Sequence, residues 1–168
     1  MKFIAGFIFA LVIVVGAGLA IMYTGSYNVA ANVPDNALVE WFLSNTMVRS
    51  ITNRAMSVKA PEQFTDQQAQ AGFSIYRNTC VYCHGAPGKD PADIAKGLNP
   101  EAPDLSDAAG DMTSAQLFWI VKNGIKMSGM ASYGKVHSDE EIWNIVAFLQ
   151  RLPKMTSEEY GRFEKEPR

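Results

Sequence analysis

Hydrophobic positions are concentrated at the N-terminus of the chain. Residues 3–23 read FIAGFIFALVIVVGAGLAIMY, and no charged residue lies between Lys2 and Asp35. At about 1.5 Å of rise per residue, a helix of this length spans about 30 Å, the thickness of a bilayer core. The pattern predicts a transmembrane anchor over residues 1–24, with Lys2 on the cytoplasmic side. A cleaved signal sequence is the alternative, although its apolar core usually runs only ~7–15 residues.

A second hydrophobic pattern has the period of a helix and covers residues 35–57. Leu38, Trp41, Phe42 and Ile51 belong to it, at spacings that place apolar side chains on one face. The aromatic residues, shortly after an anchor, suit a docking or membrane-interface helix. Packing of this face on the domain that follows is the simpler interpretation, and we favour it. We therefore assign residues 25–62 to a linker that contains an amphipathic helix.

Further helices are predicted by their start and stop signals. Residues 66–80 form an apolar face behind Asp66, a suitable N-cap. Capping-box pairs precede two more apolar stretches, 117–121 and 142–149. The pairs are Thr113 with Gln116 and Ser138 with Glu141.

The stretch from Gly85 to Gly110 is rich in Pro, Gly and Asp and has no sustained period. A loop of this length inside a compact domain needs an explanation, and wrapping around a large prosthetic group is one. No segment alternates long enough to predict a strand. The predicted fold class is all-α, with long loops in a domain over 63–153 and a solvated polar tail over 154–168.

The composition of the chain limits which classes of function it can have. With 48% hydrophobic and 19% charged residues and a formal charge of −2, the chain is globular and is not expected to bind nucleic acid. Two cysteines and two histidines are enough for one metal site, and three of these four residues lie within residues 80–84.

Those three residues form the motif Cys80-Val81-Tyr82-Cys83-His84. Cys-x-x-Cys-His is the attachment signature of c-type haem. Thiols at i and i+3 share one face of a helical turn, so both can reach the two vinyl groups of one porphyrin. The next residue brings an imidazole under the iron. We therefore predict one covalently attached haem c.

Other interpretations of the motif explain fewer of its residues and less of the sequence around it. A zinc site needs about four ligands, and His137 is the only further histidine. A thioredoxin-like redox pair would lie in a βαβ context, which the pattern does not predict. A disulfide between Cys80 and Cys83 would leave His84 and the long loop unexplained.

The second axial ligand of the iron has three candidates: Met130, Met127 and His137. Methionine sulfur is a soft ligand that favours ferrous iron. Met130 is the preferred candidate, because it lies on a loop between two predicted helices that can fold back over the haem. Core filling is the alternative role for any methionine.

Residues 66–153 resemble a class I monohaem cytochrome c domain. The resemblance lies in the Cys-x-x-Cys-His motif and in Gly129-Met130-Ala131-Ser132-Tyr133-Gly134, which is similar to the family's distal methionine loop. It supports Met130 as the ligand. Ala131 stands where the family often has proline, which implies a less rigid loop.

The resemblance also implies two contacts. Gly72 of the first helix would be crossed by the last helix, at Trp143 or Phe148. A backbone carbonyl of Pro100 or Pro103 would accept the Nδ1–H of His84 and set the orientation of its ring.

The predicted function is that of an electron carrier without catalytic residues. It would pass single electrons between protein partners, from a single-pass anchor in the inner membrane with the haem domain on the periplasmic side. A haem subunit of a larger membrane oxidoreductase is the alternative. A ligand-binding haem sensor is a further one, which the methionine loop disfavours.

Overall fold

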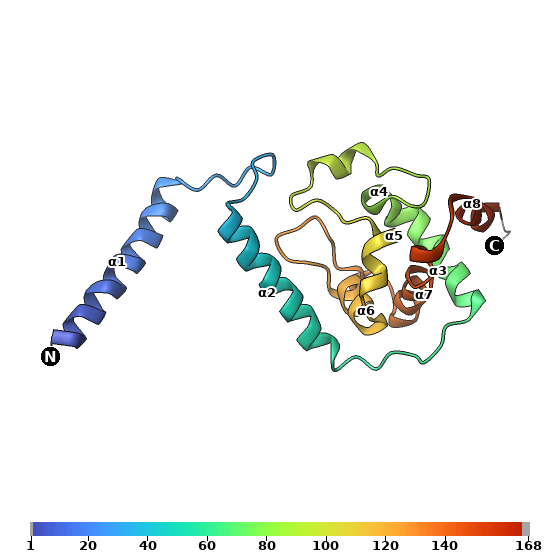
Figure 1. Cartoon of the computed structure of the whole chain (residues 1–168), viewed down its shortest axis with the longest axis horizontal. Coiled ribbons are helices and arrows are strands. Elements are labelled where there is room, and N and C mark those ends of the chain that lie inside the picture. The colour runs from blue at the N-terminus through green and yellow to red at the C-terminus, as the bar shows by residue number, and fades with distance from the viewer. Residues whose placement is uncertain (1, 166–168) are drawn as a thin grey trace. The chain divides into compact units, whose positions relative to one another are not determined.

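The computed structural model describes residues 2–165. It divides into two compact units, residues 1–34 and residues 35–168 (Figure 1). The α-helices and the short 3₁₀ helices follow in this order: α1 (Lys2–Thr24), α2 (Ala37–Ala55), α3 (Asp66–Thr79), α4 (Val81–His84), η1 (Asp93–Gly97), α5 (Leu105–Ala108), η2 (Ala109–Asp111), α6 (Ser114–Asn123), η3 (Tyr133–Lys135), α7 (Asp139–Leu149), η4 (Leu152–Lys154) and α8 (Ser157–Lys165). Over residues 2–165 there is no strand, only a bridge between Ala86 and Lys89. The all-α prediction is confirmed.

The first unit consists of α1 and the residues that follow it up to Pro34. Helix α1 has 23 residues and no buried side chain, and Lys2 at its start is its one charged residue. It is long and apolar enough to cross a membrane, a property that signal sequences share.

The second unit is organised by the crossing of α3 and α7. A Cβ atom on Gly72 would lie 1.8 Å from the carbonyl oxygen of Asn144, so only glycine permits this approach. The resemblance implied that Trp143 or Phe148 lies against Gly72 at this crossing. The atoms nearest to Gly72 are instead backbone atoms of Asn144 and Ile145. Phe148 still packs on α3, against Phe73 and Tyr76, whereas Trp143 turns to Phe118 of α6.

Aromatic rings fill the core beside this crossing. Phe148 packs against Phe73 and Tyr76, with ring centroids 5.4 and 5.0 Å apart. Trp143 stacks on Phe118 of α6 at 4.1 Å. Edge and offset contacts of this kind add to the stabilisation that burial alone provides. The core thus joins α3, α6 and α7 into one scaffold.

The helix starts follow the sequence signals closely. The predicted capping boxes Thr113–Gln116 and Ser138–Glu141 are both formed. Asp66 is not the N-cap of α3; Thr65 is, in a capping box with Gln68. Asp66 forms an ion pair with Arg151 instead, at 2.6 Å. The hydroxyl and amide of a Thr-x-x-Gln pair satisfy two backbone N–H groups, one more than Asp66 alone would.

Helix α2 packs on α6 through its C-terminal half. Ile51 and Ala55 are buried there, and the Gln116 amide donates a hydrogen bond to the Thr52 hydroxyl at 3.3 Å. The packing interpretation of this segment is therefore correct for its second half, while Leu38, Trp41 and Phe42 remain exposed.

The C-terminal segment differs from the solvated tail that was predicted. Residues 157–165 form α8, and Tyr160 is buried with its ring 5.3 Å from that of Phe73. Phe163 packs beside it, at 5.4 Å from the same ring. Two signals for this helix are present in the sequence. Thr156 and Glu159 form the hydrogen bonds of a capping box. Tyr160 and Phe163, three residues apart, then place two aromatic rings on one side of the helix. The charged composition of the segment concealed this pattern.

Candidate haem-binding site

The Cys-x-x-Cys-His motif lies on the short helix α4, directly after α3. Cys80 is the C-cap of α3 and the N-cap of α4, and its carbonyl accepts hydrogen bonds from the N–H groups of Cys83, at 3.1 Å, and His84, at 2.9 Å. Both cysteines are free thiols, half-buried on the same turn. This is the arrangement in which two thiols reach one flat group from the same side.

The ring of His84 is oriented by a backbone carbonyl. Its Nδ1 lies 2.9 Å from the oxygen of Pro103. Because a carbonyl can only accept, Nδ1 is the donor, and in the neutral ring Nε2 then keeps its lone pair for a metal ion. Of the two carbonyls implied by the resemblance, the structure selects that of Pro103.

The turn after His84 is held by the core. The buried hydroxyl of Tyr76 donates a hydrogen bond to the carbonyl of Gly85 at 2.7 Å. Burial raises the pKa of Tyr76, with smaller contributions from Cys80, Tyr160 and Asp104, so this hydroxyl stays protonated and remains a donor. Gly85 has φ +63°, and a Cβ there would lie 2.8 Å from the carbonyl oxygen of Lys89, so the turn requires glycine. Tyr76 thus fixes the point at which the chain leaves the motif.

The half-buried thiol of Cys80 differs in acidity from a reactive redox thiol. Burial, and secondarily the neighbouring Cys83, raise the pKa of Cys80 to about 12. Reactive redox thiols have a lowered pKa and an electropositive setting. Cys80 has the opposite character, which disfavours a thioredoxin-like pair. Over residues 2–165, no group of at least three His, Cys, Asp and Glu side chains is placed to hold a metal ion.

Met130 and Met127 differ in their surroundings. The loop turns back at Gly124, where a Cβ would lie 2.6 Å from the carbonyl oxygen of Met130. That oxygen accepts a hydrogen bond from the Ile125 N–H at 3.1 Å, and the Met130 N–H donates to the Ser128 hydroxyl, also at 3.1 Å. Met130 is half-buried, whereas Met127 is 77% exposed with φ +61°. The loop therefore holds Met130 in place and turns Met127 outward.

His137 lies beyond the methionine loop and stacks on Tyr133, with ring centroids 6.2 Å apart. Its Nδ1 is buried, has no hydrogen-bond partner among the described residues, and lies 3.7 Å from the carboxylate of Glu141. Its surroundings are thus those of a packed ring at the start of α7.

The methionine loop meets the segment that follows the motif. Gly129 lies against Leu98, because a Cβ on Gly129 would be 2.4 Å from the Leu98 side chain. Burial raises the pKa of Tyr133, and Cys80 and Cys83 raise it further, so this phenol lies within electrostatic reach of both thiols. Leu98 had no sequence signal as a site residue, because its role depends on a contact between two loops far apart in the chain.

These residues fit a covalently bound haem. The donor set comprises two thiols on one turn, an imidazole with its Nε2 free, and a thioether on a loop that meets the same region. Between residues 85 and 110 only Gly85, Ala95 and Ala109 are buried, so this long segment has almost no side-chain core of its own. A large apolar group would supply that core.

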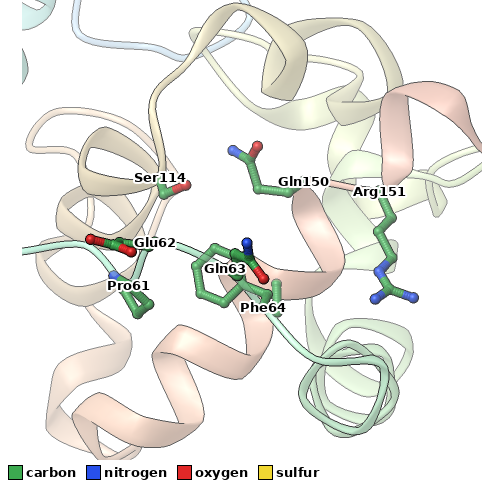
Figure 2. A pocket seen from close by; sticks show the side chains of 8 residues that line it. Pro61, Glu62, Gln63, Phe64, Ser114, Gln150 and Arg151 are labelled. Atoms are coloured by element: carbon green, nitrogen blue, oxygen red, sulfur yellow. The ribbon is translucent and has the colours of Figure 1, made fainter.

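A separate hollow lies between the linker and the ends of α6 and α7 (Figure 2). Glu62, Phe64, Ser114 and Gln150 are among its lining residues, and Arg151 at its edge is paired with Asp66. It contains none of the candidate haem ligands, so the haem chemistry lies elsewhere.

The fold and the site define a c-type cytochrome domain of the class I monohaem type. Residues 67–149 match the family model described as cytochrome C oxidase, cbb3-type, subunit III. The domain is that of an electron carrier that holds a covalently bound c-type haem with its iron.

The curated proteins that are similar to this chain include two that share one name. Photosystem II extrinsic protein V of Trieres chinensis is 26% identical over 113 residues, which cover 58% of this chain and 68% of that protein. The protein of the same name from Guillardia theta is 27% identical over 112 residues, with the same coverage. The family match runs from the second residue of α3 to the last residue of α7.

Proposed function

We propose that Cys80 and Cys83 attach the haem as thioethers and that His84 and Met130 are its axial ligands. The observation that carries this proposal is the hydrogen bond from His84 to the carbonyl of Pro103, at 2.9 Å on the helical turn that bears both thiols. A histidine on a solvated surface needs no such partner, whereas a metal-ligating histidine almost always has one.

Each residue would have a defined role. Pro103 holds the His84 ring in the tautomer that presents Nε2. Ser128 and Ile125 fix the backbone of Met130, so its thioether approaches from a loop of restricted conformation. The bound haem supplies one-electron chemistry, cycling its iron between the ferric and ferrous states. With His84 and Met130 both bound to the iron, the chain would leave no coordination position for a substrate.

We further propose that α1 stays in the mature protein as a single transmembrane anchor in the inner membrane, with the haem domain on the periplasmic side. The 23 residues of α1 and its apolar composition support this. The anchor would hold an electron carrier close to membrane-bound donors and acceptors.

The visible spectrum of the reduced membrane fraction tests these assignments. The full chain would be expressed in a host with a haem-maturation system, and spectra recorded before and after addition of carbon monoxide. A c-type spectrum that the gas does not shift supports a closed His/Met site in a membrane protein. A shifted spectrum would refute the closed site, and haem found only in the soluble fraction would refute the anchor.

A subunit role is the second candidate, and the family match favours it, because that family is described as a subunit of an oxidase. Purification in mild detergent distinguishes the two. Co-purification with other haem- or copper-containing chains in fixed ratio supports the subunit role, and a chain that purifies alone supports a free carrier.

A further inference from the structure

The two halves of α2 lie in different surroundings. The C-terminal half is held on α6 by the buried side chains of Ile51 and Ala55 and by the hydrogen bond between Gln116 and Thr52. The N-terminal half has no buried residue, although Val39 and Leu43 are partly covered. One end of the helix is therefore fixed to the haem domain, and the other presents side chains outward.

The outward side chains at this free end are large and apolar. Leu38 is 71% exposed, Trp41 62% and Phe42 61%. Spacings of three and four residues place them on one side of the helix, opposite Val39 and Leu43. We call these three residues the α2 patch. Contiguous exposed apolar surface of this kind marks a site that another surface covers.

The chain itself indicates what lies nearby. Only residues 25–36 separate Thr24, the end of α1, from Ala37. At ~3.5 Å per residue this connection reaches about 40 Å at most, and it contains a single charged residue, Asp35. A membrane that holds α1 therefore keeps the start of α2 within that distance of its surface.

The chemistry of the patch suits lipid headgroups better than a protein. Trp and other aromatic side chains favour the membrane–water interface. From Ala37 to Val48 the only charged residue is Glu40, and Ser44, Asn45 and Thr46 are neutral and polar. A specific protein interface uses complementary charges to set its register, and this half of α2 offers almost none.

We propose that the α2 patch inserts into the headgroup region of the membrane that α1 spans. This inference rests on the anchoring proposed above. The haem domain would then have two attachments, one through the flexible connection and one through α2, which is itself fixed to α6. The second attachment would restrict the orientation of the haem domain on the membrane surface.

Site-specific photo-cross-linking tests the proposal on the full-length holoprotein. The photoreactive residue p-benzoylphenylalanine would replace Phe42 in one variant (Phe42→p-benzoylphenylalanine). The control replaces Met56, which is 76% exposed at the opposite end of the same helix. Both variants would be reconstituted in vesicles of phosphatidylcholine and phosphatidylglycerol, irradiated and analysed by mass spectrometry. Neither position belongs to the haem-binding machinery.

We expect a mass increase of one phospholipid at position 42 and none at position 56. Equal labelling of both positions, or of neither, would overturn the proposal. Cross-linking in native membranes gives a further test: adducts of position 42 with a protein chain in place of lipid would overturn the proposal and favour a subunit role.

The same samples distinguish a failure of the α2 patch proposal from a failure of the anchoring by α1. A chain that stays with the membrane and keeps its reduced c-type spectrum, but lacks the lipid adduct, refutes the inference alone. A chain lost from the membrane refutes the anchor.

Discussion

Gly72 and Asn144 bring the backbones of α3 and α7 into direct contact, with no space for a side chain between them. We expect Gly72→Ala to destabilise the domain by about 3 kcal/mol or more, because neither backbone can move without disturbing the aromatic core. Denaturant unfolding of the haem-loaded protein measures this.

Gly161 is the matched control for this substitution, since it also lies in a helix but has open space where a Cβ would stand. Gly161→Ala should stabilise the protein by about 0.5–1 kcal/mol, the gain from removing glycine from a helix. Equal effects of the two substitutions would show that helix propensity, and not the crossing, determines the result.

The methionine loop provides the second prediction. Met130→Ala should keep the covalent haem, because the thioethers are untouched, but should let the ferrous protein bind carbon monoxide and should lower its reduction potential. Met127→Ala is the control, as Met127 is exposed and turned away. If Met127→Ala opens the iron and Met130→Ala does not, the ligand assignment is reversed.

Tyr160 gives a third prediction, about α8. Tyr160→Ala should cost about 3 kcal/mol, because the buried ring packs on Phe73 and its removal leaves a cavity. The hydroxyl of Tyr160 is buried without a hydrogen-bond partner among the described residues. Tyr160→Phe should therefore be neutral or stabilising by up to about 1 kcal/mol, since it removes an unsatisfied polar atom. Thermal unfolding of the two variants side by side separates packing from polarity.

The fourth prediction concerns acid stability and the cap of α7. Hydrogen bonds from the backbone N–H and the hydroxyl of Ser138 lower the pKa of Glu141 below its model-compound value of 4.5, and His137 contributes further. A carboxyl whose pKa is lower in the folded state stabilises it at pH values above 4.5, and this stabilisation is lost as the pH falls through the folded pKa.

Glu141→Gln keeps a capping side chain but removes the charge. The wild-type protein should be the more stable of the two at neutral pH, and the difference should shrink as the pH falls below 4.5. Ser138→Ala serves as the partner variant: it removes the hydroxyl donor and keeps the backbone N–H, so the Glu141→Gln difference should depend less on pH without becoming independent of it. A wild-type advantage that grows on acidification would contradict the assignment. Unfolding midpoints measured from pH 7 to pH 3 make the comparison.

The sequence was most informative where a structure depends on neighbouring residues. The capping boxes at Thr113 and Ser138 were readable, because their hydrogen bonds join residues three apart. The choice of Pro103 over Pro100 was not readable, because it depends on how a long loop folds back onto His84. The Gly72 crossing could be anticipated, but its partner residue depends on the rotation of α7 about its own axis. The burial of Tyr160 was missed because a charged segment was taken for a solvated one.

The capping boxes have a consequence for the order in which the holoprotein assembles. Helices α3, α6 and α7 each begin with a reciprocal pair of hydrogen bonds, and α8 begins with the same pattern at Thr156. These bonds form within four residues of chain and need no prosthetic group. The segment from Gly85 to Gly110, by contrast, buries almost nothing of its own. We therefore expect the thiols to be presented, before attachment, at the end of a helix whose start is already defined, and the loop to close last, around the group it has received.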